Sequence, residues 1–288
     1  MRRQYVLLAK PWIVVANLLS AAGGFFLAAA RGDASPGLFV ATLSGIALMV
    51  ASGCVFNNCF DRDIDARMAR TRQRPLATGA ISLPRALLYG AVLGLAGLAT
   101  LWVGTSGLVL AIVLAGFVIY VGVYTMLLKR HFTVSTLVGS LAGAAPPLAA
   151  YCAVANRLDG GGLLVLAIFS SWQVPHSYAI AMARADEYAA VDVPVLPVRI
   201  GLAATRRHLV WHTAAFVLAT QLLPFFGYVG GWYWLVTTVL GAYWLSLAFF
   251  GPRGVPVVAW ARRLYRLSIV TIFCVSLLMA VDAVGPVF

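Results

Sequence analysis

Three oxygen-bearing side chains recur every fourth residue at the end of a long apolar segment. Asn57, Asp61 and Asp65 occupy positions i, i+4 and i+8, so a helix that continues through them carries all three on one face. Mg²⁺ prefers oxygen ligands; it commonly takes one or two carboxylates and fills the rest of its shell with substrate phosphate and water. The spacing therefore predicts a magnesium site, with these three residues as its ligands.

Basic side chains follow this segment, and they suit a phosphate ligand. Arg70 and Arg74 lie shortly after Asp65 in the same polar stretch. Planar guanidinium groups bind phosphate oxygens through paired N–H donors. We predict that Arg70 and Arg74 stabilise a diphosphate during catalysis, and that Asn58 and Arg62 contact the same substrate. Two simpler explanations stay open: the arginines could only orient the chain in a membrane, and the aspartates could only balance their charge.

A second polar stretch offers further carboxylates. Asp186 and Glu187 are adjacent, and Asp192 follows them. Two metal ions that clamp a leaving group are a common means of stabilising its negative charge. We therefore predict Asp186 and Glu187 as ligands of a second Mg²⁺, with Asp192 as an alternative to either.

Two further features could contact a substrate. The basic turn formed by Lys129, Arg130 and His131 suits a phosphate or an acidic acceptor group. His176 lies beside Pro175 inside an apolar segment, where an ionisable side chain is costly and usually has a function. We predict a catalytic or substrate-binding role for His176, although a histidine inside a core is often only a packing residue.

The elements that carry these residues are predicted to be membrane-spanning helices. The chain has 288 residues, of which 62% are hydrophobic and 10% are charged, whereas soluble domains carry about 25% charged residues. Apolar stretches near the roughly 20 residues that cross a bilayer recur along the whole chain. We predict a single all-α membrane domain of residues 1–288 with about nine spanning helices, at residues 12–30, 37–56, 86–104, 107–128, 134–155, 162–182, 208–228, 231–250 and 265–284.

The distribution of positive charge predicts how these helices are oriented. With nine crossings, almost all of the 21 Lys and Arg residues fall on one side of the membrane, and only Arg31 and Arg157 fall on the other. Short basic loops stay in the cytoplasm, so we predict a cytoplasmic N-terminus and a periplasmic C-terminus. The long connections 57–84 and 184–207, which hold the candidate site, are then both cytoplasmic. By this interpretation the net charge of +12 is an orientation signal and does not indicate nucleic-acid binding.

The polar motifs resemble those of the UbiA superfamily of intramembrane prenyltransferases. The resemblance covers nearly the whole chain and points to the heme-modifying members. It rests on the segments Asn57–Asp65, Arg70–Gly79, Tyr120–Tyr124, Gly143–Pro147, Trp172–His176 and Val193–Pro197. It implies about nine helices around a central cavity, with the aspartate motifs on the cytoplasmic side of a bacterial inner membrane. Asn57, Asp61 and Asp65 match the first metal motif of the family, whereas Asn58 stands where many relatives have Asp.

The resemblance also implies a reaction. Members that modify heme use Mg²⁺ to transfer a farnesyl group from farnesyl diphosphate to a vinyl group of heme b, and water then adds to give heme O. Membrane lipid and a heme A synthase or a terminal oxidase are the implied partners. Tyr120, Tyr124 and Trp172 could shield a farnesyl cation with their ring faces, or they could only pack in the core. His176 could remove a proton from the water or contact the heme.

Two alternatives to this function stay open. The acceptor could be an aromatic quinone precursor or a chlorophyll-like molecule. A transporter with a cytoplasmic Mg²⁺ site is more distant, because transporters tend to place polar residues at the middle of the bilayer, whereas most acidic residues here lie in the two long connections.

Overall fold

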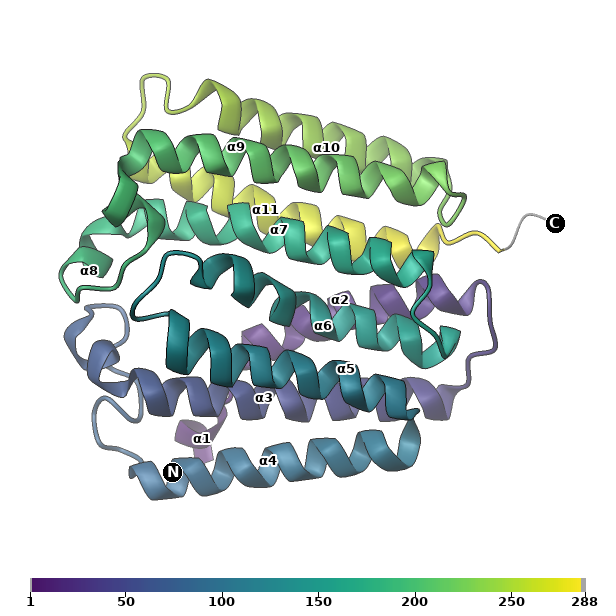
Figure 1. The fold of residues 1–288 in the computed structure, drawn as a ribbon, viewed down its shortest axis with the longest axis horizontal. Helices are drawn as coiled ribbons and strands as arrows, with labels where there is room; N and C mark the ends of the chain where they lie inside the picture. The colour runs from purple at the N-terminus through teal and green to yellow at the C-terminus, as the bar shows by residue number, and fades with distance from the viewer. Residues whose placement is uncertain (1, 286–288) are drawn as a thin grey trace.

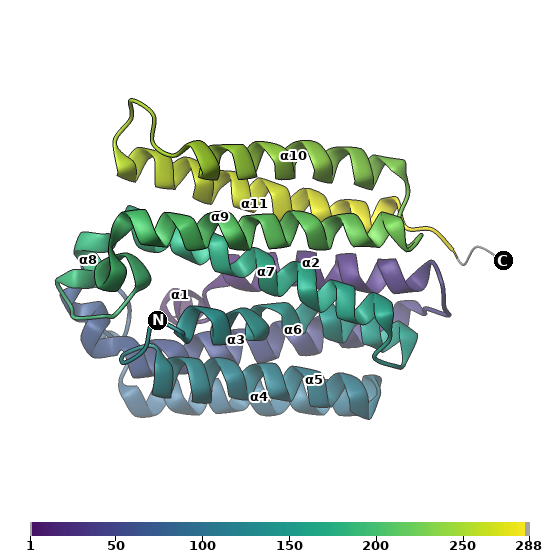
Figure 2. The ribbon, with the colours of Figure 1, turned by 45° about the horizontal axis from the view of Figure 1, so that its top comes forward.

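The computed structural model of the chain describes residues 2–285, which form helices that run side by side along one common direction (Figures 1 and 2). The helices are α1 (Arg2–Leu8), α2 (Pro11–Ala29), α3 (Pro36–Arg67), α4 (Leu83–Gly104), α5 (Gly107–Phe117), the π-helix η1 (Val118–Leu128), α6 (Ser135–Ala155), α7 (Gly160–Ala183), α8 (Ala185–Ala189), α9 (Leu196–Phe225), α10 (Gly231–Phe250) and α11 (Val257–Val281).

Eight helical segments within residues 2–285 are long and apolar enough to cross a membrane, counting α5 and η1 as one. The helix α9 packs against α7 and α10 along the same direction and makes one further crossing of the bundle (Figure 2). The predicted all-α membrane fold with about nine helices is therefore confirmed. The α1 helix and the last turn of α11 lie at opposite ends of the bundle (Figure 1).

Prolines and polar caps mark where several of these helices begin. Ser35 precedes α3 and its hydroxyl accepts a hydrogen bond from the Leu38 amide, at 3.1 Å. Asp159 precedes α7 and accepts from the Gly162 amide, at 3.1 Å. Such caps satisfy amide groups that have no partner in the first turn of a helix. Both helices begin at the end of the bundle away from α8 (Figure 1). From there they run toward the end that holds the candidate site.

Two consecutive glycines let α2 pack closely between two other helices. A Cβ on Gly23 would lie 2.6 Å from the carbonyl oxygen of Ser276 in α11, and one on Gly24 would lie 2.3 Å from that of Pro147 in α6. Helices in a membrane associate largely through such close contacts between small residues. Any larger residue at either position would separate α2 from the helix that it contacts.

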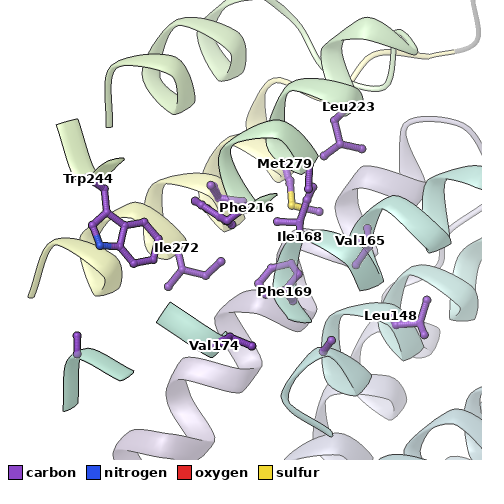
Figure 3. Packing of buried hydrophobic residues seen from close by; sticks show 14 of the residues in the cluster. Leu148, Val165, Ile168, Phe169, Val174, Phe216, Leu223, Trp244, Ile272 and Met279 are labelled. Atoms are coloured by element: carbon purple, nitrogen blue, oxygen red, sulfur yellow. The ribbon is translucent and has the colours of Figure 1, made fainter. Parts of the chain in front are cut away.

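The largest buried cluster within residues 2–285 is formed mainly by α7, α9, α10 and α11 and also includes residues of α2 and α6. Figure 3 shows Phe216 of α9 and Trp244 of α10 beside Ile272 and Met279 of α11. The rings of Phe216 and Trp244 meet edge to face with their centroids 5.4 Å apart, a geometry that aromatic pairs favour. This part of the bundle is filled by side chains, and the cavities described below lie among α2, α3, α5, η1, α6 and α7.

The structure corrects three expectations about element boundaries. The connection 184–207, predicted as a loop, contains α8 and the first turns of α9, which bends at Gly201, where φ is 78°. α11 begins at Val257, well before the predicted start at residue 265. The span 107–128 changes from an α-helix to a π-helix at Val118. π-helical turns are rare and are frequently found at functional sites.

Candidate active site

The three predicted metal ligands lie on one face of α3, and all are buried. α3 continues without a break through residue 67, so Asn57, Asp61 and Asp65 are stacked on successive turns. Their exposed fractions are 4%, 2% and 5%. Two carboxylates with so little exposure require positive partners, because burial of an unpaired charge is strongly unfavourable. α3 thus extends beyond the predicted span 37–56, and the condition under which the three residues share one face is met.

Two lysines from distant parts of the chain provide part of that positive charge. Lys10 donates from Nζ to Oδ1 of Asn57 at 2.6 Å. The Asn57 amide in turn donates to Oδ2 of Asp61, at 2.9 Å, and to the hydroxyl of Thr125, at 3.3 Å. Lys129 forms an ion pair with the same Oδ2 of Asp61. The first two predicted ligands are thus joined into one polar network by residues from α3, η1 and the two turns that carry the lysines.

Arg74 forms an ion pair with Asp65, the third predicted ligand. Its Nη1 donates to Oδ2 of Asp65 at 2.7 Å and to Oδ1 of Asn58 at 3.3 Å. Asn58 also donates to the carbonyl oxygen of Leu8 at 2.9 Å, which holds the end of α1 against α3. A single guanidinium nitrogen is engaged by these contacts, and the remaining N–H groups of Arg74 stay available for a phosphate.

These residues surround a polar cavity of about 150 Å³ at the end of the bundle. It is lined by Lys10, Asn57, Asp61, Ile64, Asp65, Met68, Arg70, Arg74, Lys129, Tyr188 and Val193. No group of three or more His, Cys, Asp or Glu side chains comes together anywhere in residues 2–285. A metal here would therefore take most of its shell from the substrate and water, as Mg²⁺ commonly does. The donor set fits this, because Oδ1 of Asp61 is buried and has no hydrogen-bond partner within residues 2–285.

The second acidic stretch packs onto the first through a small apolar cluster. Ile64 and Met68 contact Val191 and Val193, which follow α8, and this contact brings α8 to the rim of the polar cavity. In the part of the chain that the structure describes, Oε2 of Glu187 is buried without a hydrogen-bond partner, like Oδ1 of Asp61. Burial lowers the pKa of Arg70, and the charges of Arg184, Tyr188 and Glu187 also act on it. None of the three predicted carboxylates lines either cavity. Asp186 and Asp192 are exposed, whereas Glu187 is half-buried next to Tyr188, which lines both cavities.

A larger and mainly apolar cavity of about 370 Å³ adjoins the polar one. The two share Asn57, Lys129 and Tyr188 in their walls. Tyr120 and Tyr124 of η1 line the larger cavity with stacked rings whose centroids lie 5.9 Å apart. The polar cavity is thus a charged chamber that suits an anion. The larger cavity next to it is an apolar chamber with aromatic faces in its wall.

Four predicted substrate contacts lie outside both cavities. One is Asn58, whose side chain bonds to Arg74 and Leu8. Arg62 is exposed and donates to the carbonyl oxygen of Cys59. Arg130 pairs with exposed Asp63 at 2.6 Å, and His131 is exposed in the same turn. Of the predicted basic turn, only Lys129 reaches the site.

Trp172 and His176 also point away from the cavities, toward α11. His176 Nδ1 and the Ser268 hydroxyl are 2.7 Å apart, and Trp172 donates to the carbonyl oxygen of Ser268 at 2.8 Å. The two rings stack with centroids 4.5 Å apart, and Tyr265 lies 5.2 Å from His176. Neither side chain lines either of these two cavities. The neighbouring residues Gln173 and Ser177 line the apolar cavity instead.

Lys10 is the site residue for which the sequence gave the weakest signal. It adopts a left-handed conformation, φ 50°, directly before Pro11, although a residue before proline strongly prefers an extended backbone. Burial lowers the pKa of Lys10 to about 8, so the ammonium group keeps its proton at pH 7. An unfavourable backbone conformation is often retained at a functional position. The Lys10–Pro11 pair was visible in the sequence, but its contact with Asn57 was not.

The sequence pattern of the UbiA prenyltransferase family matches residues 17–281. This match spans the cavity walls on α2, α3, η1, α6 and α7 and leaves only short ends outside. The chain belongs to the UbiA prenyltransferase family. The resemblance predicted from the polar motifs is therefore confirmed.

Relatives that are about half identical to the chain are named protoheme IX farnesyltransferase. A protein of Chromohalobacter salexigens named protoheme IX farnesyltransferase is 49% identical over 98% of this chain and 95% of its own length. One of Pseudomonas savastanoi with the same name is 49% identical over 97% of this chain and 95% of its own length. Protoheme IX farnesyltransferase 2 of Chromobacterium violaceum is 50% identical over 99% of this chain and 94% of its own length.

Solved UbiA-type structures share the fold at low sequence identity. A digeranylgeranylglyceryl phosphate synthase superposes with a TM-score of 0.79 at 16% identity and covers 98% of both chains. A UbiA homologue from Archaeoglobus fulgidus bound to GPP and Mg²⁺ superposes with a TM-score of 0.72 at 17% identity, over 96% of this chain and 99% of that one. These likenesses extend the assignment to the fold of the whole bundle.

Proposed function

We propose that residues 1–288 form one membrane-embedded enzyme that transfers the farnesyl group of farnesyl diphosphate to a vinyl group of heme b, with addition of water to give heme O. The observation that carries the proposal is the adjacency of a charged chamber and an apolar chamber that share Asn57, Lys129 and Tyr188. A prenyl diphosphate has the same two parts, a charged head and an apolar chain. Relatives about half identical to this chain and named protoheme IX farnesyltransferase support heme as the acceptor.

The charged chamber would hold the diphosphate together with Mg²⁺. Asn57, Asp61 and Asp65 are the proposed ligands, and Glu187 is the candidate for a second ion. Bound Mg²⁺ would neutralise the negative charge that develops on the diphosphate when the allylic C–O bond breaks. The phosphate oxygens would be contacted by four basic residues held in fixed positions: Lys10, Arg70, Arg74 and Lys129. Little reorganisation would then be needed as negative charge grows on the diphosphate.

The apolar chamber would hold the prenyl chain and the reacting vinyl group. The faces of Tyr120 and Tyr124 would stabilise the allylic cation, because a ring face attracts positive charge. The chamber must keep bulk water away from this cation, and the mainly apolar wall suits that requirement. The terminal carbon of the vinyl group then bonds to the farnesyl carbon that loses the diphosphate.

A product assay tests the donor, the acceptor and the metal together. Purified protein in detergent, given heme b, farnesyl diphosphate and Mg²⁺, is expected to form a farnesylated and hydrated heme detected by mass spectrometry. EDTA is expected to abolish the product, and added Mg²⁺ should restore it, because the acidic ligands cannot hold the diphosphate alone. If the folded protein leaves heme unchanged but prenylates an aromatic quinone precursor, the acceptor assignment is wrong.

We propose further that the chain lies in a bacterial inner membrane with the charged chamber on the cytoplasmic side. The two arginines outside the predicted cytoplasmic segments, Arg31 and Arg157, lie in connections at the opposite end of the bundle (Figure 1). Heme O would then pass within the membrane to a heme A synthase or a terminal oxidase.

Reporter fusions test this orientation. Alkaline phosphatase fused after residue 288 is expected to be active, and the same enzyme fused after Arg130 is expected to be inactive, because it folds only in the periplasm. Green fluorescent protein at the two positions should give the reverse pattern. An active phosphatase after Arg130 would place the charged chamber on the periplasmic side.

A further inference from the structure

One face of α7 brings two polar side chains into the apolar chamber. Gln173 and Ser177 are one helical turn apart, and both line this cavity together with Ile180 and Ala181 of the same helix. The fit of the diphosphate to the charged chamber uses neither of them. They place hydrogen-bonding groups in the chamber that we propose for the prenyl chain and the vinyl group, which are both hydrocarbon.

The amide of Gln173 rests in a notch on α6 that exists because residue 143 is glycine. A Cβ on Gly143 would lie 2.0 Å from Oε1 of Gln173 and 2.7 Å from its Cδ. Real atoms cannot approach so closely, so any larger residue at 143 would push the amide away. Packing against the α6 backbone therefore fixes where this amide lies.

The hydrogen-bonding groups of Gln173 and Ser177 are free to bind something in the cavity. Ser170 and Ser171, on the same helix, donate to backbone carbonyls one turn earlier, both at 2.6 Å. Within residues 2–285, neither the Ser177 hydroxyl nor the Gln173 amide makes such a bond to the protein. An amide offers two donors and an acceptor, and a hydroxyl offers one donor and an acceptor. A water molecule stays in an apolar cavity only with two or more polar partners.

We propose that Gln173 and Ser177 hold the water molecule that adds to the prenylated vinyl group. This inference rests on the proposed function. The vinyl π electrons form the bond to the farnesyl carbon, and the diphosphate leaves with the C–O electron pair. Positive charge then lies on the vinyl carbon next to the porphyrin ring. A lone pair of the held water forms the new C–O bond, and its proton passes to the departing diphosphate.

Neutral groups suit this task better than ionised ones. A carboxylate at either position would bond to the farnesyl cation or neutralise it before transfer, whereas an amide and a hydroxyl only orient the water. Without an oriented water, the second cation would lose a proton from the neighbouring carbon to the diphosphate. The product would then be an alkene that is lighter by one water molecule.

The ratio of hydrated to dehydrated product tests the proposal. Gln173→Met keeps the length of the side chain and removes its hydrogen bonds, and Ser177→Ala removes the hydroxyl. With heme b, farnesyl diphosphate and Mg²⁺, each variant is expected to keep total prenyl transfer within about threefold and to lower this ratio by about tenfold, the size expected from the loss of one buried hydrogen bond. Mass spectrometry of the extracted hemes measures both quantities.

Two further variants separate water binding from a general disturbance of α7. Gly143→Ala displaces the Gln173 amide without removing it and should lower the ratio as well. Ser171→Ala is the matched control, since its hydroxyl already bonds to Ala167 and lines neither cavity; it should leave the ratio unchanged.

The outcomes distinguish this inference from the function on which it rests. A hydrated product from the unmodified chain with the same ratio in Gln173→Met and Ser177→Ala would overturn the assignment of the water site alone. A higher KM for heme with an unchanged ratio would do the same and would make Gln173 a contact to the acceptor. No prenylated heme from the unmodified chain would overturn both.

Discussion

Asp61→Asn is expected to lower the rate of prenyl transfer by at least about 10³-fold, near the upper end of what loss of one preorganised electrostatic contact costs. Asp61 is 2% exposed, and its Oδ2 accepts hydrogen bonds from Lys129 and Asn57, while Oδ1 has no partner among the described residues 2–285. The substitution keeps the size of the side chain but removes the charge that a metal ligand needs. It also leaves Lys129 without its carboxylate. Initial rates at saturating substrate and a titration with Mg²⁺ measure the loss.

Asp63→Asn is the matched control on the same helix. Asp63 lies two residues further, is exposed and pairs with Arg130 outside both cavities. Exposed ion pairs contribute about 0–1 kcal/mol to stability, so this variant should transfer the prenyl group within about twofold of the unmodified rate. If Asp61→Asn were as active as Asp63→Asn, the charged chamber would not be the site of diphosphate activation.

The first acidic motif could be predicted because its geometry is local. Asn57, Asp61 and Asp65 share a face in any uninterrupted helix, whatever surrounds it. The one assumption was that α3 continues past the apolar stretch, and it does, as far as Arg67. The number of membrane crossings follows from local hydropathy. That number also places the two long connections at the same end of the bundle.

The contents of the cavity wall could not be predicted, because they depend on how helices rotate against each other. α7 has two candidate faces, one with Trp172 and His176 and one with Gln173 and Ser177, and neighbouring residues differ by about 100° around a helix. The sequence favoured the histidine face. The hydrogen bonds of Trp172 and His176 to Ser268 turn that face toward α11, and the amide face turns toward the chamber.

Contacts between segments that are far apart in the sequence could not be predicted either, because they also depend on how the helices pack. Lys10 meets Asn57 only because α1 is held against α3, partly by the bond from Asn58 to Leu8. Tyr188 reaches both cavities because Val191 and Val193 pack on Ile64. None of these pairs has a spacing that periodicity could detect. The π-helix η1 also has no proline or repeated motif that distinguishes it from an apolar α-helix.

Arg74→Met is expected to lower both stability and diphosphate use, because Arg74 has two tasks. Its Nη1 pairs with Asp65, whose side chain is 7% exposed, and the same nitrogen bonds to Asn58. Removal of one partner from a buried pair typically costs about 3–5 kcal/mol, and the partial exposure of Arg74, 25%, should reduce that cost. Transfer should fall about 10²-fold as a phosphate contact is lost. Arg72→Met is the control, since Arg72 is exposed and lines neither cavity.

Arg74→Lys separates the two tasks. A lysine can keep the charge beside Asp65, so the melting temperature should stay close to that of the unmodified chain. Its single nitrogen cannot pair with Asp65 and also offer a planar fork to the phosphate, so the KM for farnesyl diphosphate should rise about tenfold while the KM for heme b stays the same. If Arg74→Lys lost stability as Arg74→Met does but kept its KM for the diphosphate, Arg74 would only balance the charge of Asp65. The phosphate contacts would then fall to Arg70 and the two lysines.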